Sequence, residues 1–244
     1  MEMPFKQKLG IYIILLLIIF TLVIQETSLL ILIIGMSFPL LTMSIGFRLF
    51  NIVKFPVRYR YIPLLFSMLV PIILFQIPIT WVSVDFLYYL VVISGAGLLL
   101  LSRIRSVKKS IEVSSVLEPI NLQVYFSQLL KITTLIICEE LLFRAFYFSF
   151  FSNPGIFEVL IGGLLFTYYH YYNRFAISLF HFTDYIYHFL LGSFFGFCLI
   201  YFDNGIIPLI LAHLIYNVTD YLTLTKRTIS YYRWKGVKSF DENA

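Results

Sequence analysis

The sequence predicts an all-α, polytopic membrane protein with about eight transmembrane helices. The 244-residue chain is 60% hydrophobic and only 13% charged, whereas soluble domains carry about 25% charge. Its mean hydropathy is +0.89. The apolar residues form runs close to the ~20 residues that a helix needs to cross a bilayer. We therefore expect residues 1–244 to form a single integral membrane domain with no separate soluble unit.

The expected spans are apolar runs separated by short polar or turn-forming connections. We place the spans at residues 10–24, 28–47, 62–82, 86–102, 126–150, 156–172, 185–202 and 206–223. Four connections contain polar residues, an interfacial Trp or turn formers: Gln25-Glu26-Thr27, Trp81 to Asp85, Asn153-Pro154-Gly155 and Asp203-Asn204-Gly205. Segment 103–125 differs, because basic residues are followed in it by spaced apolar ones. We expect it to lie along the cytoplasmic membrane surface; a plain connecting loop is the alternative.

The basic residues predict how the chain is oriented in the membrane. The net charge of +5 raises the question of a nucleic-acid partner. However, Lys and Arg fall into groups separated by apolar stretches long enough to cross the membrane twice, which is the positive-inside pattern. The four short connections contain neither residue type, so we place them outside and both termini in the cytoplasm. We expect the lipid bilayer, and no nucleic acid, as a partner.

Arg144 is the one basic residue that fits no loop or tail. It follows the adjacent carboxylates Glu139 and Glu140 within an otherwise apolar run. Ionisable residues at membrane depth cost about 2.5–3.5 kcal/mol each on insertion scales and usually mark a functional site. On a helix Glu140 and Arg144 share a face, so we expect them to pair. Glu139 is rotated by about 100° and is available for proton chemistry. The alternative is a charge cluster that only holds helices together.

Two further polar groups lie in later predicted spans. Phe166 and His170 are four residues apart, as are His213 and Asn217, so each pair shares one face of its helix. Taken alone, His170 is typical of an interfacial histidine, and the His213–Asn217 pair is typical of polar contacts between membrane helices. Their meaning therefore depends on where the topology places them.

The predicted topology places all three polar groups in the cytoplasmic half of the bilayer. Glu139 is about eight residues, or roughly 12 Å, from the cytoplasmic Lys131. His213 is about ten residues from the cytoplasmic end of its span, and His170 is one turn from Arg174. The groups can then converge on one cavity, and this set of residue types suits the attack of water on a carbonyl carbon.

Each residue has a distinct role in such a reaction. Glu139 is the expected general base, and His170 helps to hold the water. His213 and Asn217 donate hydrogen bonds to the developing oxyanion, a role whose loss typically costs about 2.7–4 kcal/mol.

The motif order E-E-x-x-x-R, F-x-x-x-H and H-x-x-x-N, each in its own span, resembles the CPBP family. That family comprises the type II CAAX-prenyl endopeptidases and the bacterial Abi, or bacteriocin-processing, relatives. The resemblance covers a CPBP-like catalytic core at about 126–223, and Gly192, Gly196 and the turn before His213 also fit it. It implies intramembrane endopeptidase activity. The residues at matching positions are Glu139, Glu140, Arg144, His170, His213 and Asn217.

The sequence leaves two alternatives for metal. Glu139, His170 and His213 have the donor types that hold Zn²⁺ with a water in the open position. However, no HExxH motif is present, and a water held by Glu139 and His170 needs no metal. We favour the metal-free chemistry and expect no cofactor.

Four other residues of chemical interest are interpreted as structural. His181 and His188 are seven residues apart and share a helix face. They have the chemistry to bind metal or line a substrate path, but we favour anchors at the membrane interface. Cys138 and Cys198 lie in apolar segments without CxxC spacing, so we expect buried thiols.

Three classes of function remain open at this point. The leading one is a peptidase that cuts a peptide or small membrane protein near the cytoplasmic leaflet, such as a leader peptide or bacteriocin-type precursor. The compact chain favours a bacterial plasma membrane, and in a bacterial host we do not expect a prenylated CAAX substrate. A non-catalytic bacteriocin-immunity or interaction protein is the alternative, although such a protein has no need of Glu139. A proton-coupled transporter is third, but no inverted repeat is visible. The sequence does not define the oligomeric state.

Overall fold

The computed structural model describes residues 27–43, 52–54, 56, 59, 61–83, 85–114, 116–172, 181–202 and 205–241. Within these residues the chain is all-α, as predicted, and contains no strand. The predicted span 10–24 lies outside them. The elements are α2 (Thr27–Leu41), α4 (Tyr61–Leu74), α5 (Phe86–Ser102), α6 (Ile104–Val113), α7 (Leu122–Glu140), the π-helix η3 (Leu141–Phe146), α8 (Ile156–Tyr172), α9 (Phe182–Tyr201), α10 (Ile206–Tyr216) and α11 (Val218–Asp241).

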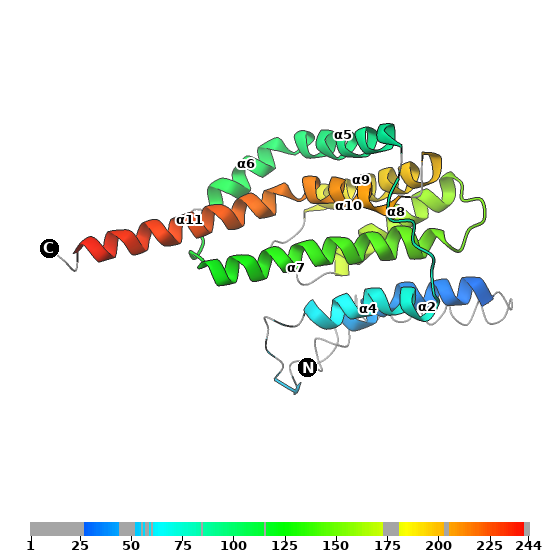
Figure 1. The fold of residues 1–244 in the computed structure, drawn as a ribbon, viewed down its shortest axis with the longest axis horizontal. Coiled ribbons are helices and arrows are strands. Elements are labelled where there is room, and N and C mark those ends of the chain that lie inside the picture. Colours follow the sequence, from blue (N-terminus) through cyan, green and yellow to red (C-terminus); the bar gives the residue numbers. More distant parts are fainter. Residues whose placement is uncertain are drawn as a thin grey trace.

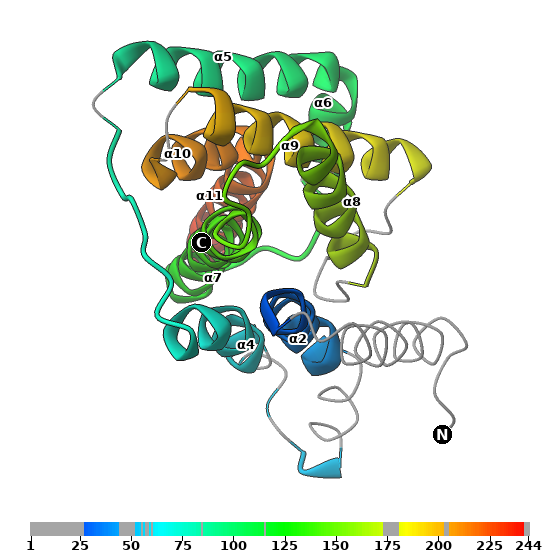
Figure 2. The ribbon, with the colours of Figure 1, turned by 90° about the vertical axis from the view of Figure 1, so that its right-hand side faces the viewer.

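Helix α7 runs through the middle of the described helices. Figures 1 and 2 show α2 and α4 side by side on one side of α7, with α5 and α6 on the opposite side. Helices α9 and α10 lie between α7 and α5, and α11 extends away from the other helices toward the C-terminus (Figure 1). One apolar cluster includes residues of α2, α4, α5 and α7 to α10. The end of α7 is therefore enclosed by other helices.

Glycines let α8 and α9 approach each other closely. A Cβ added at Gly163 would lie 3.0 Å from the backbone nitrogen of Ser193, and one added at Gly192 would lie 3.1 Å from the Cα of Gly163. Small residues at helix crossings are typical of membrane bundles. The approach brings Phe166 and His170, one and two turns further along α8, against α9.

Helix α4 ends well before the end of the predicted span 62–82. Gln76 has a left-handed backbone with φ of 50°, and the amide of Ile77 donates to the carbonyl of Ile72 (3.1 Å). Together with Pro78, this is a common way for a helix to terminate. Residues 77–83 have no regular secondary structure. The prediction of one helix to residue 82 is therefore wrong.

The segment 77–83 pairs with the start of α10. The carbonyls of Thr80 and Trp81 accept hydrogen bonds from the amides of Ile206 and Ile207, both 3.0 Å long. A helix leaves its first amides without intrahelical partners, and this segment supplies two of those partners. Segment 77–83, which is far from α10 in the sequence, thereby helps to fix the position of α10.

Two other predicted spans are interrupted. The span predicted at 126–150 begins as α7 at Leu122 and changes to a π-helix after Glu140. The span predicted at 206–223 breaks at Asn217, where φ is −90° and ψ is 14°, and the axes of α10 and α11 differ by 50°. By contrast, α5 and α8 have the bounds that the sequence predicts.

The predicted count of eight spans is not confirmed. Among the described residues, α9 is long and apolar enough to cross a membrane as one helix, and the number rises to three if the bent pairs α5–α6 and α10–α11 each form one span. Helices α2 and α4 are apolar but contain only 15 and 14 residues. They rise about 21–23 Å, less than the ~30 Å hydrocarbon core. Short and broken helices therefore reduce the count.

The predicted surface segment 103–125 contains α6, whose residues are all at least partly exposed. It bends by 68° from α5 and packs against α11. Lys226 donates to the carbonyl of Ile111 (2.7 Å), and Arg227 donates to the carbonyl of Glu118 (3.0 Å). The segment is thus a helix and a loop attached to α11, and its last residues already belong to α7.

Candidate active site

A buried cluster of charged residues lies where α7 passes into η3. Glu139 and Glu140 end α7 and Arg144 lies in η3, and none of the three residues is more than 3% exposed. The Nε atom of Arg144 is 3.3 Å from Oε2 of Glu140. The predicted Glu140–Arg144 pair is therefore confirmed. It forms across a π-helical turn, a feature frequently found at functional sites.

His213 of α10 holds the other oxygen of Glu140. Its Nδ1 is 2.7 Å from Oε1 of Glu140, and both side chains are buried. Because Glu140 also pairs with Arg144, we assign it as a carboxylate that accepts the Nδ1–H of His213. A buried ion pair is stable only when further hydrogen bonds satisfy its atoms. These contacts support a structural role for Glu140.

Two aromatic rings cover the guanidinium of Arg144. Its Cζ lies 5.0 Å from the ring centroid of Phe166 on α8 and 5.6 Å from that of Phe195 on α9. Both distances are within the range of cation–π attraction. Within the described residues, Nε and Nη2 of Arg144 and Oε2 of Glu140 have no hydrogen-bond partner. The rings therefore provide part of the stabilisation that hydrogen bonds do not.

Glu139 faces two imidazole rings from other helices. Its Oε2 is 4.0 Å from Nε2 of His170 on α8 and 3.8 Å from Nε2 of His213 on α10. The predicted convergence of these three residues is therefore confirmed. The distances are too long for direct hydrogen bonds and suit groups that bind one water between them.

The partners of the two Nδ1 atoms define which ring nitrogens face Glu139. Nδ1 of His170 is 2.9 Å from the carbonyl oxygen of Phe166, and a carbonyl can only accept, so this nitrogen carries the proton. Nε2 of a neutral His170 is then an acceptor on the side of Glu139. His213 likewise donates from Nδ1 to Glu140, so its Nε2 donates only when the ring carries both protons.

Asn217 is not joined to this cluster in the described part of the chain. It lies at the break between α10 and α11 and is half-buried. Its backbone amide donates to the carbonyl of His213 (3.0 Å), but its side chain makes no hydrogen bond to Glu139 or His170 within the described residues. The predicted i, i+4 relationship holds for the backbone, and the role of Asn217 as a donor to the oxyanion stays a prediction.

The donor types of Glu139, His170 and His213 suit zinc, but their spacing does not. Tetrahedral zinc with bonds of ~2.1 Å separates its ligands by about 3.4 Å, whereas Oε2 of Glu139 is 3.8 and 4.0 Å from the two imidazole nitrogens. Across the residues described here, no group of three or more His, Cys, Asp or Glu side chains is arranged to hold a metal ion. These residues do not fit zinc in this geometry.

His188 adjoins the site, and its predicted role as an interfacial anchor is wrong. Its side chain is buried, and its ring stacks on His170 with centroids 4.1 Å apart. The sequence contains a signal for this position: His188 is one turn before Gly192, whose side of α9 faces α8. His181, in contrast, is exposed at the start of α9.

Tyr169 is another residue of the site that the sequence did not indicate. Its hydroxyl interacts with the Glu139 carboxylate but lies outside hydrogen-bond geometry and has no hydrogen-bond partner among the described residues. Its ring also packs 5.4 Å from that of Phe143. A phenol that follows Phe166 in an aromatic run carries no pattern that distinguishes it from a core residue.

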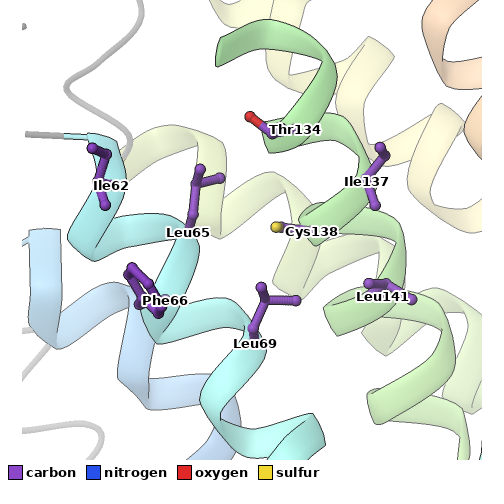
Figure 3. Close-up of a pocket in the computed structure, with 8 residues that line it drawn as sticks. All are labelled: Ile62, Leu65, Phe66, Leu69, Thr134, Ile137, Cys138 and Leu141. Carbon is purple, nitrogen blue, oxygen red and sulfur yellow. The ribbon is translucent and has the colours of Figure 1, made fainter. Parts of the chain in front are cut away.

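An apolar pocket of about 350 Å³ lies between α4 and α7, on another face of α7 (Figure 3). Cys138 is buried, as predicted, and it lines this pocket. Glu140 is two residues further on and therefore points away from the pocket by about 160°. Its lining contains no charged side chain: Ile62, Leu65, Phe66, Leu69, Thr134, Ile137, Cys138 and Leu141. A reaction site needs converging polar groups, so we assign it to the cluster around Glu139.

These features define an all-α protein whose apolar helices enclose a site of two carboxylates, one arginine and histidines. Residues 121–219 match the family model described as Rce1-like, type II CAAX prenyl endopeptidase Rce1-like. The predicted resemblance to the CPBP family is therefore confirmed over this segment. All residues of the Glu139 cluster lie within the matched segment. No curated protein matches the chain, and no solved structure matches it.

Proposed function

We propose that the chain is an intramembrane endopeptidase in which Glu139 activates a water for attack on a peptide carbonyl. The observation that carries this proposal is the position of Oε2 of Glu139, within 4.0 Å of imidazole nitrogens from two other helices. Glu140, in contrast, is engaged by Arg144 and His213. The two adjacent carboxylates therefore have different roles: Glu140 holds the site together and Glu139 transfers protons.

The first step is the addition of water to the carbonyl carbon. The water donates one hydrogen bond to Glu139 and one to Nε2 of His170, which orients a lone pair of its oxygen toward the substrate. As the carbon–oxygen bond forms, Glu139 takes the proton. The carbonyl π electrons move to the carbonyl oxygen, which becomes an oxyanion.

His213 is the first donor to that oxyanion. Glu139 and Glu140 carry two negative charges and Arg144 carries one positive charge, so a second proton on His213 makes the buried group neutral overall. Burying a neutral group costs less than burying a net charge. The doubly protonated ring donates from Nδ1 to Glu140 and from Nε2 to the oxyanion. The side chain of Asn217, one turn further along, is the proposed second donor.

The second step breaks the peptide bond. The oxyanion collapses to a carboxyl group, the electron pair of the carbon–nitrogen bond moves to nitrogen, and Glu139 returns its proton to that nitrogen. The products are a carboxylic acid and an amine, and Glu139 is again a carboxylate. Because this sequence uses only side chains of the chain, we propose that it needs no metal and no cofactor.

The proposed substrate is a peptide or small membrane protein that is cut near the cytoplasmic leaflet. The family match supports a protease whose relatives act on prenylated CAAX peptides. As substrate we favour a leader peptide or bacteriocin-type precursor in a bacterial plasma membrane over a prenylated CAAX peptide. The positive-inside pattern supports a topology with both termini in the cytoplasm.

The decisive experiment compares peptide termini in membranes. Cells express either the wild type or Glu139→Gln at matched abundance, and new termini are identified by mass spectrometry. Purified protein is also incubated with a farnesylated CAAX peptide and with its unprenylated form. The Glu139→Gln variant is the matched control, because it keeps the size and polarity of the side chain and removes its basicity.

The expected result is a set of termini that requires the wild type and is absent with Glu139→Gln. Cleavage of the farnesylated peptide alone would assign the prenylated class, and cleavage of neither peptide beside Glu139-dependent termini would favour a leader or bacteriocin-type precursor. Identical termini in both membranes under several growth conditions would overturn the peptidase proposal and favour an interaction or immunity protein.

A further inference from the structure

His170 contacts two aromatic rings. The ring of Phe166 lies with its centroid 4.4 Å away at an interplanar angle of 58°. The ring of His188 lies 4.1 Å away at 28°, which is a stacked arrangement, and it is also 6.2 Å from the ring of Phe166. His170 is therefore fixed at its edge by the Nδ1 bond to the Phe166 carbonyl and on its face by His188.

His188 is itself fixed by the first turn of α9. Its Nδ1–H donates to the carbonyl oxygen of Asp184 (2.6 Å). The carboxylate of Asp184 accepts from the backbone amide of His181 (2.8 Å) and forms an ion pair with Arg103 (2.5 Å). Asp184 thus links the surface-facing side of α9 to the ring that covers His170.

Arg103 ties this turn to two other helices. It lies at the bend between α5 and α6 and donates from Nη1 to the hydroxyl of Tyr216 (2.8 Å). Its guanidinium also lies 5.0 Å from the ring centroid of Tyr187. Tyr216 is the last residue of α10 and follows His213 by one turn. Both imidazoles that face Glu139 are therefore connected to the same arginine, His170 through α9 and His213 through α10.

We propose that His188 is a positioning residue for the hydrolysis proposed above, on which this inference rests. The stacked rings face each other, whereas a hydrogen bond to an imidazole nitrogen lies in the ring plane. His188 therefore acts through its ring face and exchanges no proton with His170. It keeps Nε2 of His170 directed at the water beside Glu139, and the Arg103–Asp184 pair keeps His188 in place.

Two substitutions separate the ring of His188 from its hydrogen bond. His188→Phe keeps an aromatic face against His170 and loses the donor to Asp184, whereas His188→Asn keeps a donor at the position of Nδ1 and loses the face. Ile186→Ala, on an exposed position of α9 (44% exposed), is the matched control. Activity is measured with a synthetic peptide that spans a Glu139-dependent cleavage site from the membrane experiment, or with the farnesylated CAAX peptide.

The expected result is a split between kcat and KM. His188→Asn lowers kcat about 10-fold because misplacement of a water-holding group slows the chemical step, and KM changes less than about twofold. His188→Phe keeps kcat within about threefold of wild type, and so does Ile186→Ala. Equal losses with Phe and Asn would overturn the proposal, because the ring face would then not matter. Wild-type kcat in His188→Asn would overturn it as well.

A second measurement does not depend on activity. Diethyl pyrocarbonate modifies accessible imidazoles, and mass spectrometry of the peptide that contains His170 gives its rate. We expect faster modification of His170 in His188→Asn than in wild type, and an unchanged rate in His188→Phe. If the wild type has no Glu139-dependent peptidase activity, the proposed function fails, and the catalytic part of this inference fails with it. If that activity is present and the modification rates are all equal, only the inference about His188 fails.

Discussion

Nδ1 of His213 and Oε1 of Glu140 are 2.7 Å apart, which joins the start of the matched family segment to its end. The same histidine faces Glu139 with Nε2 at 3.8 Å. One ring thus has a structural contact on one edge and a catalytic position on the other. The two edges can be removed separately, since Asn replaces Nδ1 of a histidine but has no counterpart of Nε2.

We expect His213→Asn and His213→Ala to be equally inactive but unequally stable. Both remove the proposed oxyanion donor, a loss of about 2.7–4 kcal/mol in activation free energy, or 10²–10³-fold in kcat. Only the alanine variant also removes a hydrogen bond to a buried carboxylate, worth about 1.5–3 kcal/mol. Melting temperatures in detergent should therefore be lower for the alanine variant. Equal melting temperatures would argue against the Glu140–His213 bond.

Substitutions of the two adjacent carboxylates should have different effects. Glu139→Gln should reduce activity by about 10²–10⁴-fold, the usual contribution of a general base, and should lower the melting temperature little, because Glu139 is 3.8 Å or more from both imidazole nitrogens. Glu140→Gln leaves Arg144 buried beside a neutral amide and should unfold at a lower temperature. The measurements are kcat and thermal unfolding of both variants at equal detergent concentration. A destabilised Glu139→Gln beside an intact Glu140→Gln would reverse the assigned roles.

The Glu140–Arg144 pair should show strong non-additivity. Removing one partner of a buried pair typically costs about 3–5 kcal/mol, whereas replacing both partners with apolar residues is often neutral. We therefore expect Glu140→Leu and Arg144→Met to reduce folded protein individually, and the double variant to recover part of it, because His213 still lacks its carboxylate partner. Folded yield after gel filtration is the readout, and the double variant should stay inactive. A stable, inactive Arg144→Met alone would contradict a structural role for this pair.

The fold class and most of the site could be predicted because each depends on a signal that the sequence itself contains. Composition alone identifies apolar helices, and the helical period identifies the Glu140–Arg144 pair. The convergence of Glu139, His170 and His213 followed from the positions of their spans. These are local or one-dimensional properties, which a single sequence contains.

What the sequence did not predict depends on tertiary contacts. The stop of α4 at Leu74 and the break at Asn217 occur where packing overrides apolar continuity, although Pro78 gave a local signal for the first. The burial of His188 depends on which face of α9 meets α8. The contact of Arg103 with Asp184 joins helices that are adjacent only in the fold, so Arg103 was indistinguishable from the other basic residues of its segment.

Chelators should leave the activity unchanged. The separations of 3.8 and 4.0 Å around Oε2 of Glu139 exceed the ~3.4 Å of tetrahedral zinc ligands, and the proposed steps need no Lewis acid. The test is the initial rate after incubation with EDTA or 1,10-phenanthroline, with a zinc peptidase treated in parallel as the control. Loss of activity that returns on addition of Zn²⁺ would show that these three side chains close around a metal.

Asn217→Ala tests whether the oxyanion has a second donor. Catalytic hydrogen bonds are often long or misaligned before substrate binds, and a rotation about χ1 redirects the side-chain amide of Asn217, which lies at a helix break. We expect kcat to fall by about 10²-fold or more, with KM and the melting temperature little changed. Thr219→Val, two residues further along and also half-buried, is the control and should keep wild-type kcat. If Asn217→Ala also stays within about threefold of wild type, His213 holds the oxyanion alone, and Asn217 only ends α10.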